Sequence, residues 1–387
     1  MSEINSSNFK KEHGDLAPDL VGVTELTSPY FFVPPSGTTE ERPEDCEPGT
    51  LRFNTDHGSL EVFRGNTIGW EQIVKRESQY LGGDSPSSNS VITTSTNSNR
   101  GTGNRGLVGG GNTPSVIDTV EYITISTFGN SSDFGNLITA MTGRAGSASR
   151  TRALFTAGVT PSYKNEIDFF TFSSTGDATD FGDAYRTMGY RGSVSNNIRS
   201  VTAGGNSPTI NESMDYVTIA QTGNGVDFGD LVNGGRSDPA CMASTTRGIF
   251  AGNGNVIDFI TIMTTGNSLD FGDATQSLVA TSACSNATRG VLKERGSSYT
   301  NAMSFLTIAT LGNMIDFGDA PNLTGKPAAN ASATRGVYAG AYGASPTGFT
   351  NQIFSIEFAN RGDGVDFGDL SFQADQPTGA SNGHGGL

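Results

Sequence analysis

The chain has 387 residues, enough for one large domain or two modest ones with a hydrophobic core. Only 16% of the residues are charged, whereas Gly occurs 52 times and Pro 15 times, a composition that favours short strands and tight turns over helices. The formal net charge of −15 argues against a nucleic-acid partner, because phosphates attract Lys and Arg, and it disfavours docking on an anionic membrane.

Residues 1–48 are polar and acidic, and we expect them to form an extended attachment arm. The arm has one apolar stretch, in which Tyr30, Phe31 and Phe32 precede a valine and two prolines. Adjacent prolines favour an extended backbone, so no separate core is expected here. The three aromatic residues are candidate attachment points for a partner, and packing on the chain's own body would explain them equally well.

Export and membrane insertion are not expected from this sequence. Its first residues are polar and lack the apolar core of a signal peptide. No apolar run approaches the ~18 residues that a membrane helix needs. We therefore expect synthesis in a cytoplasm without export by the chain's own signals, and no membrane insertion.

Residues 49–79 are predicted to form a small β-hairpin module. Two runs that alternate apolar and polar residues, the first beginning at Leu51, flank an Asp-His-Gly turn. A lone hairpin is only marginally stable, so this one should pack against the arm, the repeats or another subunit, with Trp70 as a further attachment candidate. Residues 80–104 are rich in Ser, Asn, Gly and Thr, which is typical of a flexible linker.

From residue 105 onward two phrases recur at spacings typical of repeat architectures. The first phrase, Gly-(Asn/Asp)-x-x-Asp-Phe-Gly-(Asp/Asn), occurs six times at intervals of 47, 47, 43, 46 and 50 residues. Its central pairs are Asp133 and Phe134, Asp180 and Phe181, Asp227 and Phe228, Asp270 and Phe271, Asp316 and Phe317, and Asp366 and Phe367. In the second phrase an arginine opens a short apolar run, at Arg105, Arg152, Arg199, Arg247, Arg289 and Arg335.

One unit, residues 236–273, is predicted to contain four strands. Its Gly266 and Asn267 match the Gly-first type II′ turn, which would join the third strand to the fourth. Apolar residues on both faces of the third strand indicate that it is covered on both sides, as in a propeller blade. The tail from Thr378 resembles the first strand that the first unit lacks. We therefore predict an all-β fold in which residues 105–387 form a six-bladed β-propeller closed by a C-terminal strand.

The Asp-Phe-Gly phrase is expected to be structural. It matches the metal-binding triplet of protein kinases, but no other kinase motif accompanies it, and enzymes rarely need six copies of a site. Each Phe would be a wedge between adjacent blades, each Gly would allow close backbone approach, and the carboxylates would cap turn amides. A ring of carboxylates that binds Ca²⁺ is the alternative, although the dense oxygen ligands of a calcium loop are missing.

The six repeat arginines are expected to bond to a turn carbonyl or to a carboxylate of the Asp-Phe-Gly-Asp phrase. The sharper alternative is an arginine ring that recognises an acidic sugar. Propeller sialidases use arginines in this way, but they also need a nucleophilic Tyr with its base, and no such pair can be picked out here.

Histidine and cysteine give no sign of a metal or catalytic centre. The histidines His13, His57 and His384 lie in the arm, the turn and the tail, without a spacing that suggests a shared metal. Cys241 and Cys284 occupy nearly matching repeat positions, where we expect small buried residues that fill a strand. We predict no catalytic residue, no cofactor and no metal ligand from these side chains.

The repeat frame resembles a kelch-type propeller, and the whole chain resembles virion structural or tail-fibre-like proteins of tailed cyanobacterial viruses. The matching residues are 17–23, 30–35, 48–56, 68–73, the Asp-Phe-Gly-Asp repeats and 381–387. The sequence departs from the pattern at Asn136, which replaces the final Asp, at Ala153 and Ser200, which replace the Gly after Arg, and at Phe354-Ser355, where Asp-aromatic is usual. The resemblance brings no catalytic residues with it.

The resemblance implies a non-enzymatic virion component, such as a fibre, tail or neck appendage. Its N-terminal region would attach to other virion proteins, and its propeller would meet a host-surface glycan or protein. Several copies, as a homo-oligomer or dispersed on the particle, would turn weak contacts into avidity. The alternative is a glycan-binding or glycan-degrading propeller of the particle.

Overall fold

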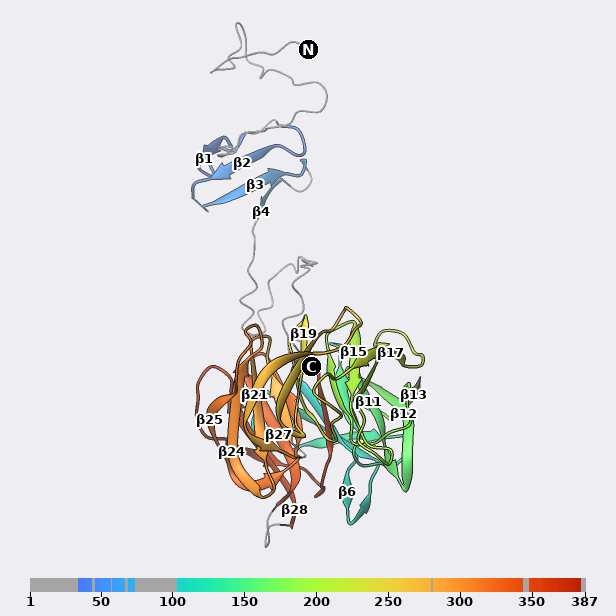
Figure 1. Ribbon diagram of the computed structural model, residues 1–387. Coiled ribbons are helices and arrows are strands. Elements are labelled where there is room, and N and C mark those ends of the chain that lie inside the picture. The colour runs from blue at the N-terminus through green and yellow to red at the C-terminus, as the bar shows by residue number, and fades with distance from the viewer. Residues whose placement is uncertain are drawn as a thin grey trace, which may run out of the picture. The chain divides into compact units, whose positions relative to one another are not determined.

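The computed structural model describes residues 34–43, 46–56, 58–66, 69–73, 103–279, 281–343 and 348–383. The chain divides into two compact units, Met1–Val91 and Ile92–Leu387 (Figure 1). Over the described ranges the fold is all-β, and none of it is a helix long and apolar enough to span a bilayer. The candidate attachment residues Tyr30, Phe31 and Phe32, and nearly all of the predicted linker, lie outside the described ranges.

The first unit contains a four-stranded sheet, which is larger than the two strands predicted from the sequence. Its strands follow one another in the order β1 (Ser36–Gly37), β2 (Leu51–Asn54), β3 (Ser59–Phe63) and β4 (Trp70–Ile73). The predicted hairpin is the antiparallel β2–β3 pair, β4 extends it, and β1 adds a parallel strand from the region assigned to the arm.

The apolar alternation of this hairpin does not mark its buried face. Arg52 and Glu61 are 5% and 0% exposed, whereas Leu51 and Leu60 are 45% and 38% exposed. Glu61 accepts hydrogen bonds from Arg42 and Asn54 and forms an ion pair with Arg52, so the buried face is held by charged hydrogen bonds. This exchange of faces could not be read from hydropathy alone.

The second unit is built from antiparallel sheets whose four strands follow one another in sequence, in a propeller-like arrangement (Figure 1). Sheets are numbered here by the Asp-Phe-Gly phrase that each contains. Sheet 1 is β30 (Thr378–Ser381), β5 (Arg105–Gly109), β8 (Thr119–Thr124) and β9 (Ser132–Asn136), so the C-terminal strand pairs with the first strand of the unit. A short hairpin of β6 (Asn112–Thr113) and β7 (Ser115–Val116) projects from it.

The remaining strands follow chain order. Sheet 2 is β10 (Ala145–Ala148), β11 (Arg152–Thr160), β12 (Ser162–Thr171) and β13 (Thr179–Asp183). Sheet 3 is β14 (Gly192–Ser195), β15 (Arg199–Ala203), β16 (Ser213–Thr218) and β17 (Val226–Asp230). Sheet 4 is β18 (Ala240–Ala243), β19 (Arg247–Ala251), β20 (Gly254–Thr261) and β21 (Leu269–Leu278).

Sheets 5 and 6 are continuous with each other. Sheet 5 is β22 (Ser282–Ser285), β23 (Arg289–Arg295), β24 (Tyr299–Thr307) and β25 (Ile315–Gly325). Sheet 6 is β26 (Ala328–Ala331), β27 (Arg335–Gly343), β28 (Gly348–Glu357) and β29 (Val365–Asp369). The end of β25 pairs with the end of β27, which joins the two sheets at one edge.

The hydrophobic core lies between sheets. Each of the six core clusters combines residues of two sheets that are neighbours, including one that joins sheet 6 to sheet 1 through Phe367 and Ile123. The third strand of sheet 4 illustrates the pattern, because Ile257 packs toward sheet 5 while Ile260 packs toward sheet 3. Apolar residues on both faces of a strand therefore find partners on both sides, as the sequence predicts.

The connection between the third and fourth strands differs from the predicted two-residue turn. In sheet 4, β20 ends at Thr261 and β21 begins at Leu269, so a longer loop joins them. Gly266 has φ of +146°, far from the value of about +60° that the first central residue of a type II′ turn requires. The Gly-Asn pair in this loop contacts the neighbouring sheet instead.

Candidate functional site

The six Phe residues of the Asp-Phe-Gly phrase are buried, with exposed fractions of 1–3%. In five sheets the ring packs edge-to-face against an aromatic residue of the third strand, with centroids 5.9–6.1 Å apart. In sheet 6, where Ser355 replaces that aromatic residue, Phe367 packs against Phe128 of sheet 1 at 5.2 Å. All six rings belong to the clusters between sheets.

The two ends of the repeated phrase bond to each other across sheets. In each case the first Gly of one phrase donates its amide to the Phe carbonyl of the preceding phrase, at 2.7–3.0 Å. The six bonds run from Gly176 to Phe134, Gly223 to Phe181, Gly266 to Phe228, Gly312 to Phe271, Gly362 to Phe317 and Gly129 to Phe367. The last of these bonds leads from sheet 1 back to sheet 6.

The residue after that Gly provides a side-chain cap. Its carbonyl or carboxylate oxygen accepts a hydrogen bond of 2.9–3.1 Å from the amide of the last residue of the preceding phrase. The capping residues are Asn130, Asp177, Asn224, Asn267, Asn313 and Asp363. This differs from the expectation that the Asp-Phe-Gly-Asp carboxylates would be the caps.

The first aspartates of the phrase, in contrast, have exposed side chains at all six positions, from Asp133 to Asp366. Of these six, Asp270 accepts a hydrogen bond of 3.0 Å from Asn233. The described residues contain no group of three or more His, Cys, Asp or Glu that could hold a metal ion. The calcium ring stays a hypothesis.

The six repeat arginines connect each sheet to the next one. Arg199 donates to the carbonyl of Ile262 at 3.2 Å and Arg247 to that of Ile308 at 2.7 Å. Arg105, Arg152, Arg289 and Arg335 make the corresponding bonds to carbonyls of Phe172, Ile219, Phe358 and Ile125. Five of the guanidinium groups also stack on the third-strand aromatic ring of their own sheet, 4.1–4.7 Å from its centroid.

Arg335 explains one departure from the repeat pattern. Its own sheet offers Ser355 where the others have an aromatic ring, and Arg335 stacks instead on Phe128 of sheet 1, at 4.6 Å. The guanidinium groups of all six arginines are thus engaged within the fold, which leaves the carbonyl interpretation better supported than an arginine ring for an acidic sugar.

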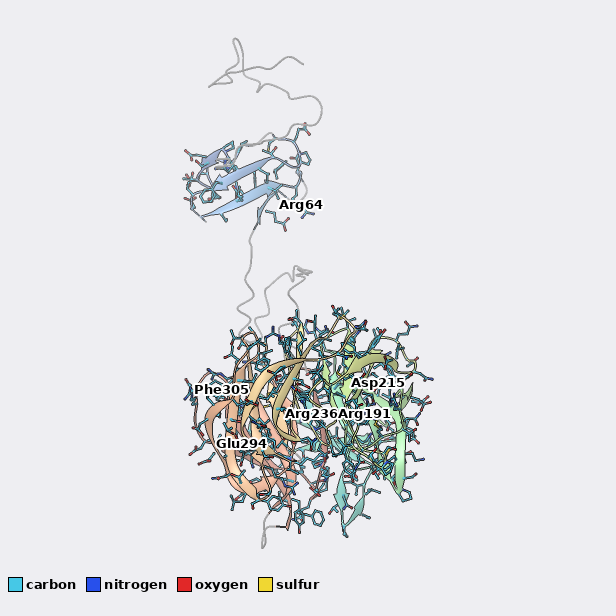
Figure 2. The ribbon with its side chains drawn as sticks, in the orientation of Figure 1. Arg64, Arg191, Asp215, Arg236, Glu294 and Phe305 are labelled. Carbon is cyan, nitrogen blue, oxygen red and sulfur yellow. The ribbon has the colours of Figure 1, made fainter. Side chains whose placement is uncertain are left out.

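Sequence reasoning missed three buried ion pairs. They join an arginine ahead of the first strand to an aspartate in the third strand, in sheets 2 to 4: Arg144 with Asp168, Arg191 with Asp215 (labelled in Figure 2) and Arg236 with Asp258. The members of each pair are no more than 4% exposed. Burial raises the pKa of Asp168, and Arg144 opposes that rise. The near-47-residue spacing of these residues is the signal that could have revealed them.

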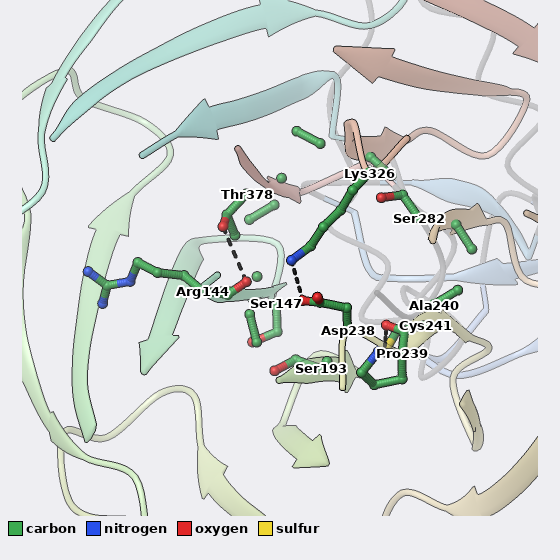
Figure 3. A pocket seen from close by; sticks show the side chains of 18 of the residues that line it. Arg144, Ser147, Ser193, Asp238, Pro239, Ala240, Cys241, Ser282, Lys326 and Thr378 are labelled. Carbon is green, nitrogen blue, oxygen red and sulfur yellow. Dashed lines mark hydrogen bonds and ion pairs between the residues drawn. The ribbon is translucent and has the colours of Figure 1, made fainter. Parts of the chain in front are cut away.

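The innermost strands enclose a cavity of about 100 Å³ (Figure 3). Residues from the start of all six sheets line it, with the small polar side chains Ser147, Ser193, Ser282 and Thr378 among them. The innermost strands contact one another in the order β30, β10, β14, β18, β22, β26 and again β30. We call this space the central cavity.

One end of the central cavity carries a charged cluster. Lys326, just ahead of β26, forms an ion pair with Asp238, just ahead of β18, so that the pair reaches across the cavity (Figure 3). The Lys326 ammonium also donates to the Gln376 amide oxygen at 3.3 Å and lies 5.1 Å from the ring centroid of Tyr190. We call Tyr190, Asp238, Lys326 and Gln376, with the neighbouring Arg295 and Asp375, the mouth.

Charges at the mouth influence one another. Burial raises the pKa of Asp375, and the positive charges of Lys326 and Arg295 oppose the rise. Burial also raises the pKa of the Tyr190 hydroxyl, with a contribution from the negative charge of Asp238. These groups are therefore close enough to act on a common ligand.

The three cysteines are not among the residues of the mouth. Cys46, Cys241 and Cys284 are free thiols, and burial raises the pKa of Cys284 to about 12. Cys284 is buried, as predicted. Cys241 lines the central cavity, and its solvent-exposed surface shows that it is only partly buried. His13, His57 and His384 fall outside the described ranges.

No protein-family model matches the sequence, and no curated protein matches it either.

Proposed function

We propose that residues 105–387 form a six-bladed propeller closed by β30, and that the chain is a non-enzymatic structural component of a bacteriophage virion. Three relations support the ring. The core clusters link each sheet to two neighbours, the innermost strands contact one another in cyclic order, and the Gly-to-Phe bonds return from sheet 1 to sheet 6. A kelch-like ring of this kind is rigid, which suits a display role.

The observation that carries the display role is the place where the chain enters and leaves the second unit. β5 and β30 are antiparallel, and the Arg105 amide donates to the side chain of Asn382, which follows β30. Lys326 and Gln376 lie at the opposite ends of the innermost strands, just ahead of β26 and β30. The N-terminal linker would therefore enter the propeller at the end opposite to the mouth.

In this proposal the first unit, with residues 1–48 and the sheet around Trp70, attaches the chain to other virion proteins of a fibre, tail or neck. The propeller then meets a host-surface glycan or protein. Several copies on one particle would raise the overall strength of attachment well above that of a single contact. The resemblance of both regions to virion structural proteins supports this assignment.

Deleting residues 1–79 tests the attachment role. We expect the shortened chain to be a soluble, folded propeller that no longer joins particles, whereas the full chain is incorporated. Incorporation would be measured by antibody to residues 105–387 on purified particles, and electron microscopy of the label would show whether the chain is at the tip, neck or head. Normal incorporation of the shortened chain would refute the attachment role.

A further inference from the structure

The mouth holds four residues other than glycine in the left-handed backbone region. Tyr190, Asp238, Lys326 and Gln376 have φ of 59°, 53°, 53° and 55°, each two positions ahead of an innermost strand. Gly143 has φ of 62° at the corresponding place in sheet 2. A left-handed residue with a side chain costs about 1 kcal/mol or more, and such strain concentrates at functional sites. At this end of the cavity, polar side chains stand where glycine would be less strained.

An aromatic cluster adjoins the mouth on sheets 5 and 6. The ring of Tyr342 lies 6.2 Å from that of Tyr299 and 5.2 Å from that of Phe349, and Tyr342 is 37% exposed. These residues lie on β24, β27 and β28, which are 9 or 10 residues long, whereas the corresponding strands of sheet 3 have 5 or 6. We call Tyr299, Tyr342 and Phe349 the aromatic platform.

Gly325 joins the platform to the mouth. It pairs with Tyr342 across the sheets and immediately precedes Lys326. A Cβ on Gly325 would lie 2.4 Å from Cδ of Arg295 and 3.2 Å from Cε1 of Tyr299. Platform and mouth are therefore one continuous surface.

Arg295 is the side chain of this surface that a ligand would most readily engage. Its guanidinium carbon lies 4.7 Å from the ring centroid of Tyr299, and it has no ion-pair partner among the described residues. Arg295 and Lys326 both act on the Asp375 carboxyl, so this surface carries two positive charges near one another. A planar guanidinium offers two parallel N–H donors, which match a carboxylate.

We propose that the mouth and the aromatic platform together bind an oligosaccharide that carries a sugar carboxylate. The flat C–H face of a sugar ring would pack on Tyr342 and Phe349, and the carboxylate would accept hydrogen bonds from Arg295. Asp238, Asp375 and Gln376 would accept from sugar hydroxyls.

This inference rests on the proposed display role and adds to it the class of ligand that the mouth and the aromatic platform would bind. Its test uses purified full-length protein, so its failure is separate from a failure of particle incorporation. The probes are oligomers of galacturonate, glucuronate and mannuronate, the neutral oligomers of galactose, glucose and mannose, and a sulfated galactan. Binding would be measured by isothermal titration calorimetry at constant ionic strength.

We expect at least one of the carboxylated oligomers to bind at least tenfold more tightly than its neutral counterpart. Arg295→Gln should weaken that binding about tenfold or more, and Tyr342→Ala should weaken it by a similar factor. The matched control is Arg186→Gln, since Arg186 is an exposed arginine beside an exposed tyrosine, Tyr185, and belongs to neither the mouth nor the aromatic platform. Unchanged melting temperatures would show that the variants fold.

Three results would overturn the proposal. The first is that no carboxylated oligomer binds more tightly than its neutral counterpart. The second is that Arg295→Gln and Arg186→Gln bind the best probe equally well. The third is that the sulfated galactan binds and none of the carboxylated oligomers does, which would assign the site to a different anion.

Discussion

The amide of Gly176 donates a 2.7 Å hydrogen bond to the carbonyl of Phe134, although the two residues belong to different sheets. A Cβ on Gly135, the residue after Phe134, would lie only 2.3 Å from the carbonyl oxygen of Gly176. The two backbones are therefore in direct contact, and the same geometry occurs at all six boundaries between sheets. The repeated phrase is thus a connector with two complementary ends.

Replacing Gly135 by Ala should destabilise the second unit more than replacing Gly176 by Ala. Both glycines have φ of +150°, so both substitutions pay the same backbone strain, about 1–3 kcal/mol. Only Gly135 has a neighbour in the way, because a Cβ on Gly176 meets no atom within 4 Å. The clash should cost roughly a further 1–3 kcal/mol.

Denaturant unfolding followed by far-UV circular dichroism would measure both free energies of unfolding. Gly176→Ala is the internal control, since it isolates the strain from the clash. Equal losses in the two variants would mean that close approach of the sheets contributes nothing, and the connector interpretation would fail.

Much of the repeat architecture could be predicted because it is local in sequence. The Asp-Phe-Gly spacing located the fourth strands, and the apolar residues on both faces of Ile257–Ile262 indicated sheets on both sides. The hydrogen-bond partner of each Gly could not be predicted. Gly176 and Phe134 lie 42 positions apart, and the sequence is equally compatible with a Gly that contacts the Phe of its own phrase.

The mouth was hidden for a different reason. Tyr190, Asp238, Lys326 and Gln376 occupy corresponding places ahead of their strands, yet each is a different residue type. A comparison of the repeats by residue type does not detect such positions, because they differ from one repeat to the next. Only the three-dimensional fold brings them together. Similarly, the alternation that begins at Leu51 does not mark the buried face of the first unit, where ion pairs place Arg52 and Glu61.

Ending the chain at Pro377 should severely destabilise the second unit. The truncation removes β30, whose Thr378, Ala380 and Ser381 are buried and whose backbone pairs with β5. Ser381 also bonds to both the amide and the carbonyl of Ala331 in sheet 6, at 2.9 and 3.0 Å. We expect a loss of at least about 3 kcal/mol or aggregation through the exposed edge of β5.

The matched control is a chain that ends at Gly383, which keeps the whole of β30. Thermal unfolding of the two truncated chains and the full chain would be compared by calorimetry. If the chain that ends at Pro377 melted together with the other two, the proposed closure by β30 would be wrong.

Acid should unfold the first unit through Glu61. Hydrogen bonding from Arg42 holds the pKa of Glu61 below its usual value of 4.5, and Asn54 contributes in the same direction. A carboxylate whose pKa is lowered in the folded state stabilises that state above its unfolded pKa. That stabilisation disappears as the pH falls below about 4.5.

Trp70 makes this prediction measurable in the full chain, because it is the single tryptophan and packs 5.4 Å from Phe63. Its fluorescence reports unfolding of the first unit alone. Glu61→Gln should make the denaturant midpoint lower at pH 7 and less dependent on pH between 3 and 6. Glu71→Gln is the control, since Glu71 pairs with Arg64 on the exposed surface and should change little. An equal response of the two variants would contradict the role of Glu61.

The last prediction concerns Lys293, which is 1% exposed and donates from its ammonium to the carbonyls of Glu294, Thr300 and Thr324. Burial lowers its pKa from 10.5 to about 8. Between these two pH values the unfolded chain binds more protons at this residue than the folded chain does. The contribution of Lys293 to stability should therefore rise with pH from about 8 to 10.5, by up to about 3 kcal/mol. Lys293→Met has no such titration, so the free energy of unfolding of the wild-type chain minus that of the variant should increase across this window. Parallel pH profiles of the two proteins, measured by denaturant unfolding, would show that the Lys293 ammonium titrates normally in the fold.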